Sequence, residues 1–171
     1  MIADLICNLL DTEYSYYKKL GAEKKPSLPE PFTASRYEDA QRFQNYSCSP
    51  VMEGFEPDTH AAEQWSDPFK GGWIAHKQGS CIKFNVSGSI IMLQYRKTIN
   101  KPAPVAYAVI DGDRQNKVLL DANFDEDWGD LCCLDEIYSG AKGEHTVEIV
   151  IDTEGKENSD FMLISVITAN K

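Results

Sequence analysis

The segment from Val105 to Asp121 constrains the fold more than any other part of the sequence. It reads VAYAVI, then Asp111-Gly112, then a polar stretch, then KVLLD. Two short β-rich runs joined through an Asp-Gly pair predict an antiparallel hairpin. Residues 105–110 are almost continuously apolar, which is typical of a strand with protein on both faces. We therefore expect a central strand in an antiparallel sheet.

Alternating patterns predict further strands of the same kind. Residues 81–86 alternate between apolar and polar side chains, and residues 91–95 repeat the pattern after a Ser87-Gly88 turn. Residues 146–151 alternate again, and an apolar run over 161–168 closes the chain. At least six strands without helical crossovers predict a mainly β fold, an antiparallel β-sandwich with jelly-roll-like connections.

The first 34 residues show a different pattern, a helix followed by a linker. Apolar residues at three-four spacing predict an amphipathic N-terminal helix over 1–21, and three prolines mark a linker over 22–34. The sandwich domain then occupies 35–171. The helix stripe (Ile2, Leu5, Ile6, Leu9 and Leu10) packs either on its own domain or on a partner outside the chain, and a homodimer through the helix is one form of the second alternative.

The segment between linker and strands carries weaker signals. Ser35 and Glu38 match a capping box, which predicts a short helix that also includes Tyr37, Ala40 and Phe43. Residues 45–70 contain three prolines and scattered aromatic side chains. They indicate either a long loop packed by its rings or a loop that contains an edge strand.

Composition excludes several partners and compartments. The net charge of −10 argues against nucleic acid and anionic membranes, which bind clustered Lys and Arg. Five cysteines without a C-x-x-C pair favour neither a disulfide framework nor a zinc site, so reduced thiols and a cytoplasmic location are the expectation. No apolar run reaches the length of a membrane span, and the first twenty residues make a poor signal peptide.

The chain shows no catalytic motif. His60, His76 and His145 stand in no pattern with a serine or cysteine nucleophile, so we name no catalytic residue. Cys132 and Cys133 are adjacent, and neighbours on a strand point to opposite faces, so we expect one core thiol and one surface thiol rather than a shared metal.

The acidic run around Trp128 is the principal candidate site. Seven carboxylates fall between Asp121 and Glu136 without a Lys or Arg. Carboxylates hydrogen-bond sugar hydroxyls while an indole face covers the apolar side of a pyranose, so Asp125, Asp127, Asp130 and Trp128 are candidates for carbohydrate binding. Calcium held by Asp121, Asp125 and Asp127 is a second possibility, and a solvated loop whose tryptophan plugs the sandwich is a third. No other cofactor is indicated.

Trp73, His76 and Arg96 form a second candidate group for ligand binding. Tyr95 and Trp73 are expected to be buried, and the polar ends of Arg96 and His76 would line any cleft near them.

The order of these pieces resembles a known family of modules. Gly72-Trp73, SCIKFNVSG, IIMLQYR, AYAVIDG, DEDWG and GEHTVEI together resemble the galactose-binding-like β-sandwich modules attached to SGNH (GDSL-type) esterases and acylhydrolases. The likeness covers residues 71–171. It implies a non-catalytic accessory domain, and the opening MIADLICNLL looks like the terminal helix of an upstream SGNH catalytic domain. The nucleophile block of that family has no match, because Arg114 follows Gly112-Asp113, and Asp58-Thr59-His60 is one residue short of its Asp-x-x-His block.

Three functions follow from this interpretation. The first is a carbohydrate-binding module that concentrates an acylated carbohydrate near the attached hydrolase. The second is a structural or interaction module that docks on the catalytic domain without a ligand. The third is a free-standing hydrolase, which the missing motifs disfavour.

Overall fold

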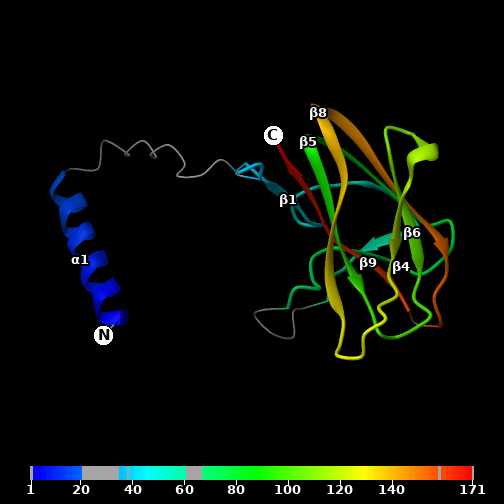
Figure 1. The fold of residues 1–171 in the computed structure, drawn as a ribbon, viewed down its shortest axis with the longest axis horizontal. Coiled ribbons are helices and arrows are strands. Elements are labelled where there is room, and N and C mark those ends of the chain that lie inside the picture. Colours follow the sequence, from blue (N-terminus) through cyan, green and yellow to red (C-terminus); the bar gives the residue numbers. More distant parts are fainter. Residues whose placement is uncertain (1, 21–34, 38, 61–66, 158, 171) are drawn as a thin grey trace. The chain divides into compact units, whose positions relative to one another are not determined.

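The computed structural model describes residues 2–20, 35–37, 39–60, 67–157 and 159–170. The chain forms two units, Met1–Ala34 and Ser35–Lys171, which we describe separately. The first unit contains helix α1 (Ile2–Leu20), as its periodicity predicts (Figure 1). Its apolar side chains Leu5, Ile6, Leu9 and Leu10 are all exposed. None of the helices in the described residues is long and apolar enough to cross a membrane.

The second unit is built from strands that pair with antiparallel neighbours. The strands are β1 (Gln41–Phe43), β2 (Val51–Glu53), β3 (Phe55–Pro57), β4 (Trp73–Ala75), β5 (Cys81–Lys97), β6 (Val105–Ile110), β7 (Val118–Asp121), β8 (Leu131–Thr153) and β9 (Phe161–Ala169). A short 3-10 helix, η1 (Arg114–Asn116), joins β6 to β7. The predicted mainly β fold is confirmed.

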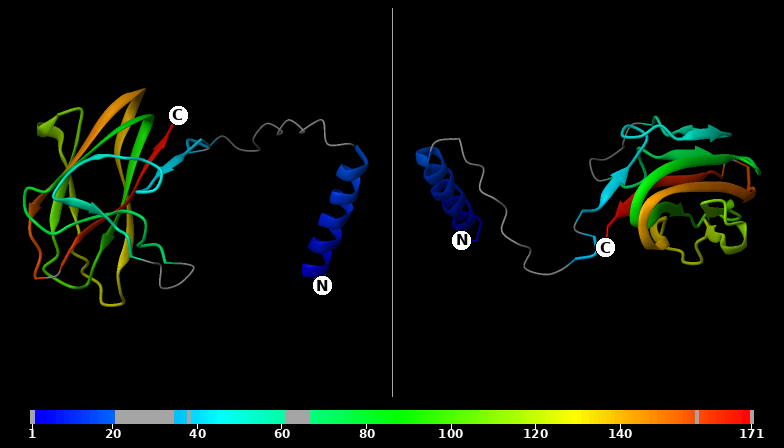
Figure 2. Two further views of the ribbon diagram at one scale, coloured as in Figure 1. Left: turned by 180° about the vertical axis from the view of Figure 1, so that it is seen from behind. Right: turned by 90° about the horizontal axis from the view of Figure 1, so that it is seen from above.

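Two long strands connect both layers of the sandwich. Residues 81–88 of β5 pair with 143–150 of β8, and residues 90–97 of β5 pair with 131–139 of β8. The first pair continues into β2 on one side and β6 and β7 on the other, and we call this set layer 1. The second pair continues through β9 to β1, β4 and β3, and we call this set layer 2. Figure 2 shows β5 and β8 curving between the layers.

Glycines occupy the bend between the layers. A Cβ at Gly88 would lie 3.1 Å from the carbonyl oxygens of Ala169 and Ile90, and the pairing with β8 shifts register between residues 88 and 90. Such bends let strands pass from one packed sheet to another. The expected Ser87-Gly88 turn between two separate strands is therefore wrong, because the ladder with β8 continues on both sides of the bend.

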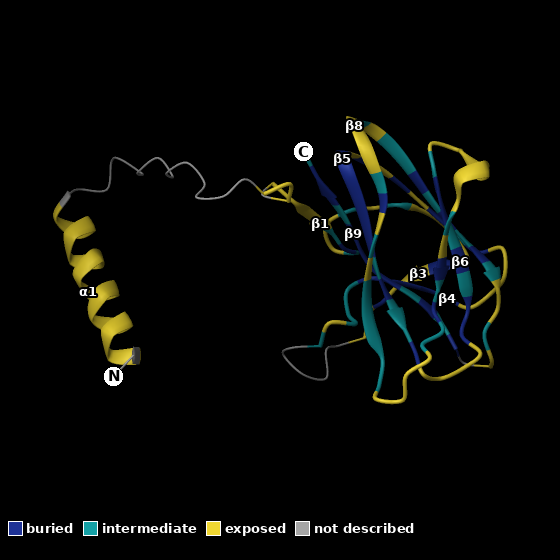
Figure 3. Ribbon diagram, in the orientation of Figure 1, coloured by how far each residue is buried: buried dark blue, intermediate teal, exposed yellow. Residues whose placement is uncertain are grey.

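The core lies between the two layers (Figure 3). Trp73 of layer 2 packs edge-on against Phe84 of layer 1, with ring centroids 5.0 Å apart. Tyr95 stacks on Phe161 within layer 2. All four side chains are buried, and they belong to one apolar cluster that both layers share. Burial of this cluster is the main source of stability for such a sandwich.

The hairpin around Asp111 is confirmed. β6 pairs with β7 on one side and β8 on the other, so it is a central strand in its layer. Asp111 and Gly112 both have positive φ, 51° and 78°, which the Asp-Gly pair tolerates. On the outer face of β6, Tyr107 is half-buried, and the ammonium of Lys117 lies over its ring.

The short helix predicted near Ser35 is wrong. Residues 35–40 form turns where they are described, and Gln41–Phe43 pair with β9 as strand β1. The Ser35 hydroxyl accepts a hydrogen bond from the Tyr37 amide, which closes a local turn instead of capping a helix. Between residues 45 and 70 the edge-strand alternative holds, since β2 and β3 lie there at the edges of the two layers.

We expect Phe84→Ala to lower the free energy of unfolding by about 3 to 5 kcal/mol, because the ring is only 3% exposed and joins the two layers. Urea unfolding followed by tryptophan fluorescence measures the loss. Ser87→Ala on the exposed face of β5 is the control, with an expected change within about 0.5 kcal/mol. Equal losses in the two variants would contradict the assigned faces of the strand.

A second prediction concerns Asp111, whose pKa is lowered by the hydrogen bond with His145 and by the Thr146 amide. A lowered pKa adds stability above the unfolded value of about 3.8 and loses it as pH falls through the folded value. We expect Asp111→Asn to cost about 1 kcal/mol at neutral pH. The gap between variant and wild type should narrow in urea titrations at pH about 2.5, and a gap that widens there would reject this assignment.

Candidate functional site

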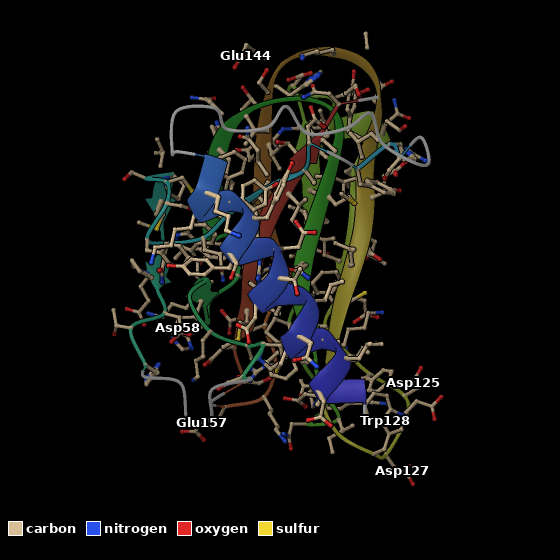
Figure 4. All side chains as sticks on the ribbon, turned by 90° about the vertical axis from the view of Figure 1, so that its left-hand side faces the viewer. Asp58, Asp125, Asp127, Trp128, Glu144 and Glu157 are labelled. Atoms are coloured by element: carbon tan, nitrogen blue, oxygen red, sulfur yellow. The ribbon has the colours of Figure 1, made fainter. Side chains whose placement is uncertain are left out.

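Most of the predicted site residues lie at one end of the sandwich. The loops 98–104, 122–130 and 154–160 meet there through backbone hydrogen bonds, from Phe124 to Thr98 and from Lys156 to Pro102. We call this region the loop end. Figure 4 shows Asp125, Asp127 and Trp128 together at this end, opposite Glu144 at the bend of β8.

Trp128 projects into solvent at the loop end. Its side chain is 63% exposed, and its ring meets Phe124 edge-on at 5.1 Å. The tryptophan therefore does not plug the sandwich. Gly129 follows with a φ of 141°, a conformation that side chains rarely adopt, and it turns the chain back toward β8. The result is an exposed indole face supported on one side by a half-buried ring.

Two of the carboxylates around Trp128 have partners from the 98–104 loop. Lys101 pairs with Asp125, and this hydrogen bond lowers the pKa of the Asp125 carboxyl. Asp130 accepts a 2.7 Å hydrogen bond from the Thr98 hydroxyl. Asp127 is exposed on the same loop. The loop end therefore combines two carboxylates that have partners, Asp125 and Asp130, with the exposed carboxylate of Asp127.

The second candidate group joins the first through Arg96. Its guanidinium lies 3.8 Å from Asp130 and donates a 3.4 Å hydrogen bond to the backbone oxygen of Asp160. The Asp160 carboxylate contacts His76 Nδ1 at 2.5 Å, and Glu56 lies 3.8 Å from the other ring nitrogen. Polar side chains thus run without a break from Glu56 to the loop of Trp128.

One member of that group is separate. Trp73 is 1% exposed and packs against Phe84 in the core, so a ligand at the surface does not reach it. Sequence reasoning missed three residues that hold the site together: Thr98, Lys101 and Asp160. They come from other loops: Thr98 and Lys101 contact the acidic run across 32 and 24 residues of sequence, and Asp160 contacts Arg96 across 64.

The three proposed calcium ligands do not converge. Asp121 accepts hydrogen bonds from the amide and side chain of Asn123, and Asp125 pairs with Lys101. Across the described part of the chain, no three histidine, cysteine or acidic side chains are placed to hold a metal ion. The donor set therefore does not fit calcium, which needs six to eight oxygens.

Each histidine has Nδ1 on a carboxylate. The pairs are His60 with Asp58 at 2.9 Å, His76 with Asp160, and His145 with Asp111 at 2.8 Å. Within the residues that the structure covers, none of these rings hydrogen-bonds a serine or cysteine, as a nucleophile would require. Cys133 packs against the core and Cys132 lies on the opposite face of β8, as adjacent strand residues should.

Comparisons with known proteins identify the group of domains. No family model and no curated protein matches the chain. A two-domain esterase active on acetylated mannans, co-crystallised with mannopentaose, matches 96% of this chain at 40% identity and a TM-score of 0.77. This chain spans 46% of that protein, about half its length.

Two more distant structures share the fold alone. A family two carbohydrate esterase from Cellvibrio japonicus matches 77% of this chain and 34% of its own at 15% identity and a TM-score of 0.54. Xyl-CBM35, in complex with a glucuronic acid containing disaccharide, matches 76% of this chain and 97% of its own at 14% identity and a TM-score of 0.50. The chain therefore belongs with the β-sandwich domains of two-domain carbohydrate esterases, which confirms the resemblance that its motifs indicated.

Proposed function

We propose that the sandwich is the carbohydrate-binding domain of an esterase that acts on acylated carbohydrate, and that its loop end holds the sugar chain. The observation that carries the proposal is the exposed indole of Trp128 beside fixed polar groups. The indole face of Trp128 is in contact with water when no ligand covers it. When the apolar side of a pyranose packs on it, both apolar surfaces are removed from water, which favours binding.

The polar groups of the loop end fit sugar hydroxyls. Asp125 and Asp130 accept hydrogen bonds, while Lys101 and Arg96 donate them. Because Asp125 and Asp130 already lie beside a cation or a donor, these two carboxylates are less available to a metal or a cationic ligand. A neutral oligosaccharide is the ligand that this arrangement favours.

The relative with 40% identity supports a mannan as that oligosaccharide. We therefore propose a mannan chain, with acetyl groups, as the ligand of this domain. Binding would raise the concentration of substrate near an attached esterase domain. We also propose that the exposed apolar stripe of α1 packs against such a catalytic domain, because none of the described residues of its own unit covers it. Self-association of the 171-residue chain through this stripe is the alternative.

We expect Trp128→Ala to weaken the binding of mannopentaose by about tenfold or more, because the main apolar contact is lost. Isothermal titration of the full chain gives the dissociation constants. Leu119→Ala is a matched control, because Leu119 is a large apolar residue that is 61% exposed on β7 in layer 1. Absence of binding by the wild type, or equal weakening in both variants, would reject the loop end as the site.

Removal of divalent cations should leave binding unchanged, because the described carboxylates do not form a calcium site. Titrations with mannopentaose in EDTA and in calcium should give dissociation constants within about twofold. Binding that appears only with calcium would show that the loop end binds this ion together with the sugar. That result would contradict the absence of a calcium site among the described carboxylates.

A further inference from the structure

A row of side chains crosses the outer face of layer 2, the face turned away from the core. Arg42 of β1 donates a 3.1 Å hydrogen bond to the Ser165 hydroxyl on β9, and Ser165 donates a 2.6 Å bond to Gln94 on β5. Leu134 on β8 is the direct partner of Gln94 in the ladder. The row therefore spans four strands, and it is not part of the loop end.

Arg42 has donors to spare. It uses one N–H on Ser165, and a guanidinium carries five. Among the residues that the structure describes, no carboxylate pairs with Arg42, although the protein has a net charge of −10. Gln94 accepts through its oxygen, which leaves its amide nitrogen to donate. Donors without acceptors thus lie on both sides of Ser165.

The other end of the row is apolar. Leu134 is 50% exposed although it lies in the middle of a paired strand segment. Cys132, two residues earlier on β8, faces the same side and is half-buried. A small apolar group placed on Leu134 therefore lies one strand spacing, about 5 Å, from the donors of Gln94.

We propose that this row binds the O-acetyl groups of the sugar chain. An acetyl ester combines the two features that the row complements, since its carbonyl oxygen accepts hydrogen bonds and its methyl group is apolar. The ester carbonyl receives N–H groups of Arg42 and Gln94, and the methyl packs on Leu134. This inference rests on the proposed carbohydrate binding, and it adds a second contact surface that recognises the acyl decoration.

The position of the row fits a single ligand. β8 leads from Asp130 at the loop end to Leu134, and four residues of extended strand cover about 13 Å. Arg96 and Cys132 lie between the two points as a cross-strand pair. One oligosaccharide laid along β8 can therefore contact Trp128 with one sugar and present an acetyl group to the row with another.

The test compares an acetylated mannan oligosaccharide with the same preparation after saponification, titrated into the full chain. The wild type should bind the acetylated form about tenfold more tightly, which is the combined gain from the hydrogen bonds of the carbonyl and the packing of the methyl group. Arg42→Ala and Leu134→Ala should each reduce this preference to about threefold or less while keeping the affinity for the saponified form. Arg114→Ala on η1 and Leu119→Ala on β7, both exposed, should retain the full preference.

The two proposals fail differently. If neither form binds, carbohydrate binding itself is wrong. If the wild type binds both forms equally, or if Arg42→Ala and Leu134→Ala keep the preference, the row does not recognise acetyl groups and the loop end stands alone. Circular dichroism of each variant confirms the strand content, and Arg42→Lys, which retains the charge without the fork of donors, should lose most of the preference.

Discussion

The structure depends on the unbroken pairing of β5 with β8 through the bend at Gly88. Because these two strands stay hydrogen-bonded on both sides of the bend, they belong to both layers and fix how the layers face each other. Each layer still keeps its own edge strands, β2 and β7 in layer 1 and β3 and residues 131–139 of β8 in layer 2. The bend occupies one end of the sandwich, the loops 98–104 and 122–130 meet at the other, and that is where a ligand surface can be built.

Much of the fold could be predicted from the alternation of apolar and polar residues, because successive side chains of a half-buried strand point alternately to the core and to solvent. The bend could not, since Ser87-Gly88 signals a turn as well as a kink. Leu131–Ser139 was also missed: its inner residues Cys133 and Ile137 are apolar, but this segment is an edge of layer 2, where charged side chains such as Asp135 are tolerated. At Ser35, tertiary pairing with β9 outweighed a local capping signal.

Some residues of the candidate site could likewise be predicted from the sequence, and others could not. The exposed Trp128 and its acidic neighbours are close in sequence and could be named from it. His76 and Arg96 were named too, but the contact between them runs through Asp160, which lies on another loop, and Arg96 reaches that group at Asp130. The spacing of Asp121, Asp125 and Asp127 indicated calcium because sequence cannot reveal that Lys101 and Asn123 take up those oxygens.

The loop end and the row from Arg42 to Leu134 differ in the hydrogen-bonding groups that they offer to a ligand. At the loop end Asp125 and Asp130 lie beside Lys101, Arg96 and the Thr98 hydroxyl, so the hydroxyl groups of a neutral sugar find both donors and acceptors there. Around Arg42 only donors are left over. A ligand that satisfies both must carry hydroxyls in one place and an acceptor without a donor in another, and an ester carbonyl is such an acceptor. Residues 131–134 of β8 lead from one surface to the other, so the paired strand sets the distance between Asp130 and Leu134, while Trp128 lies on the preceding loop.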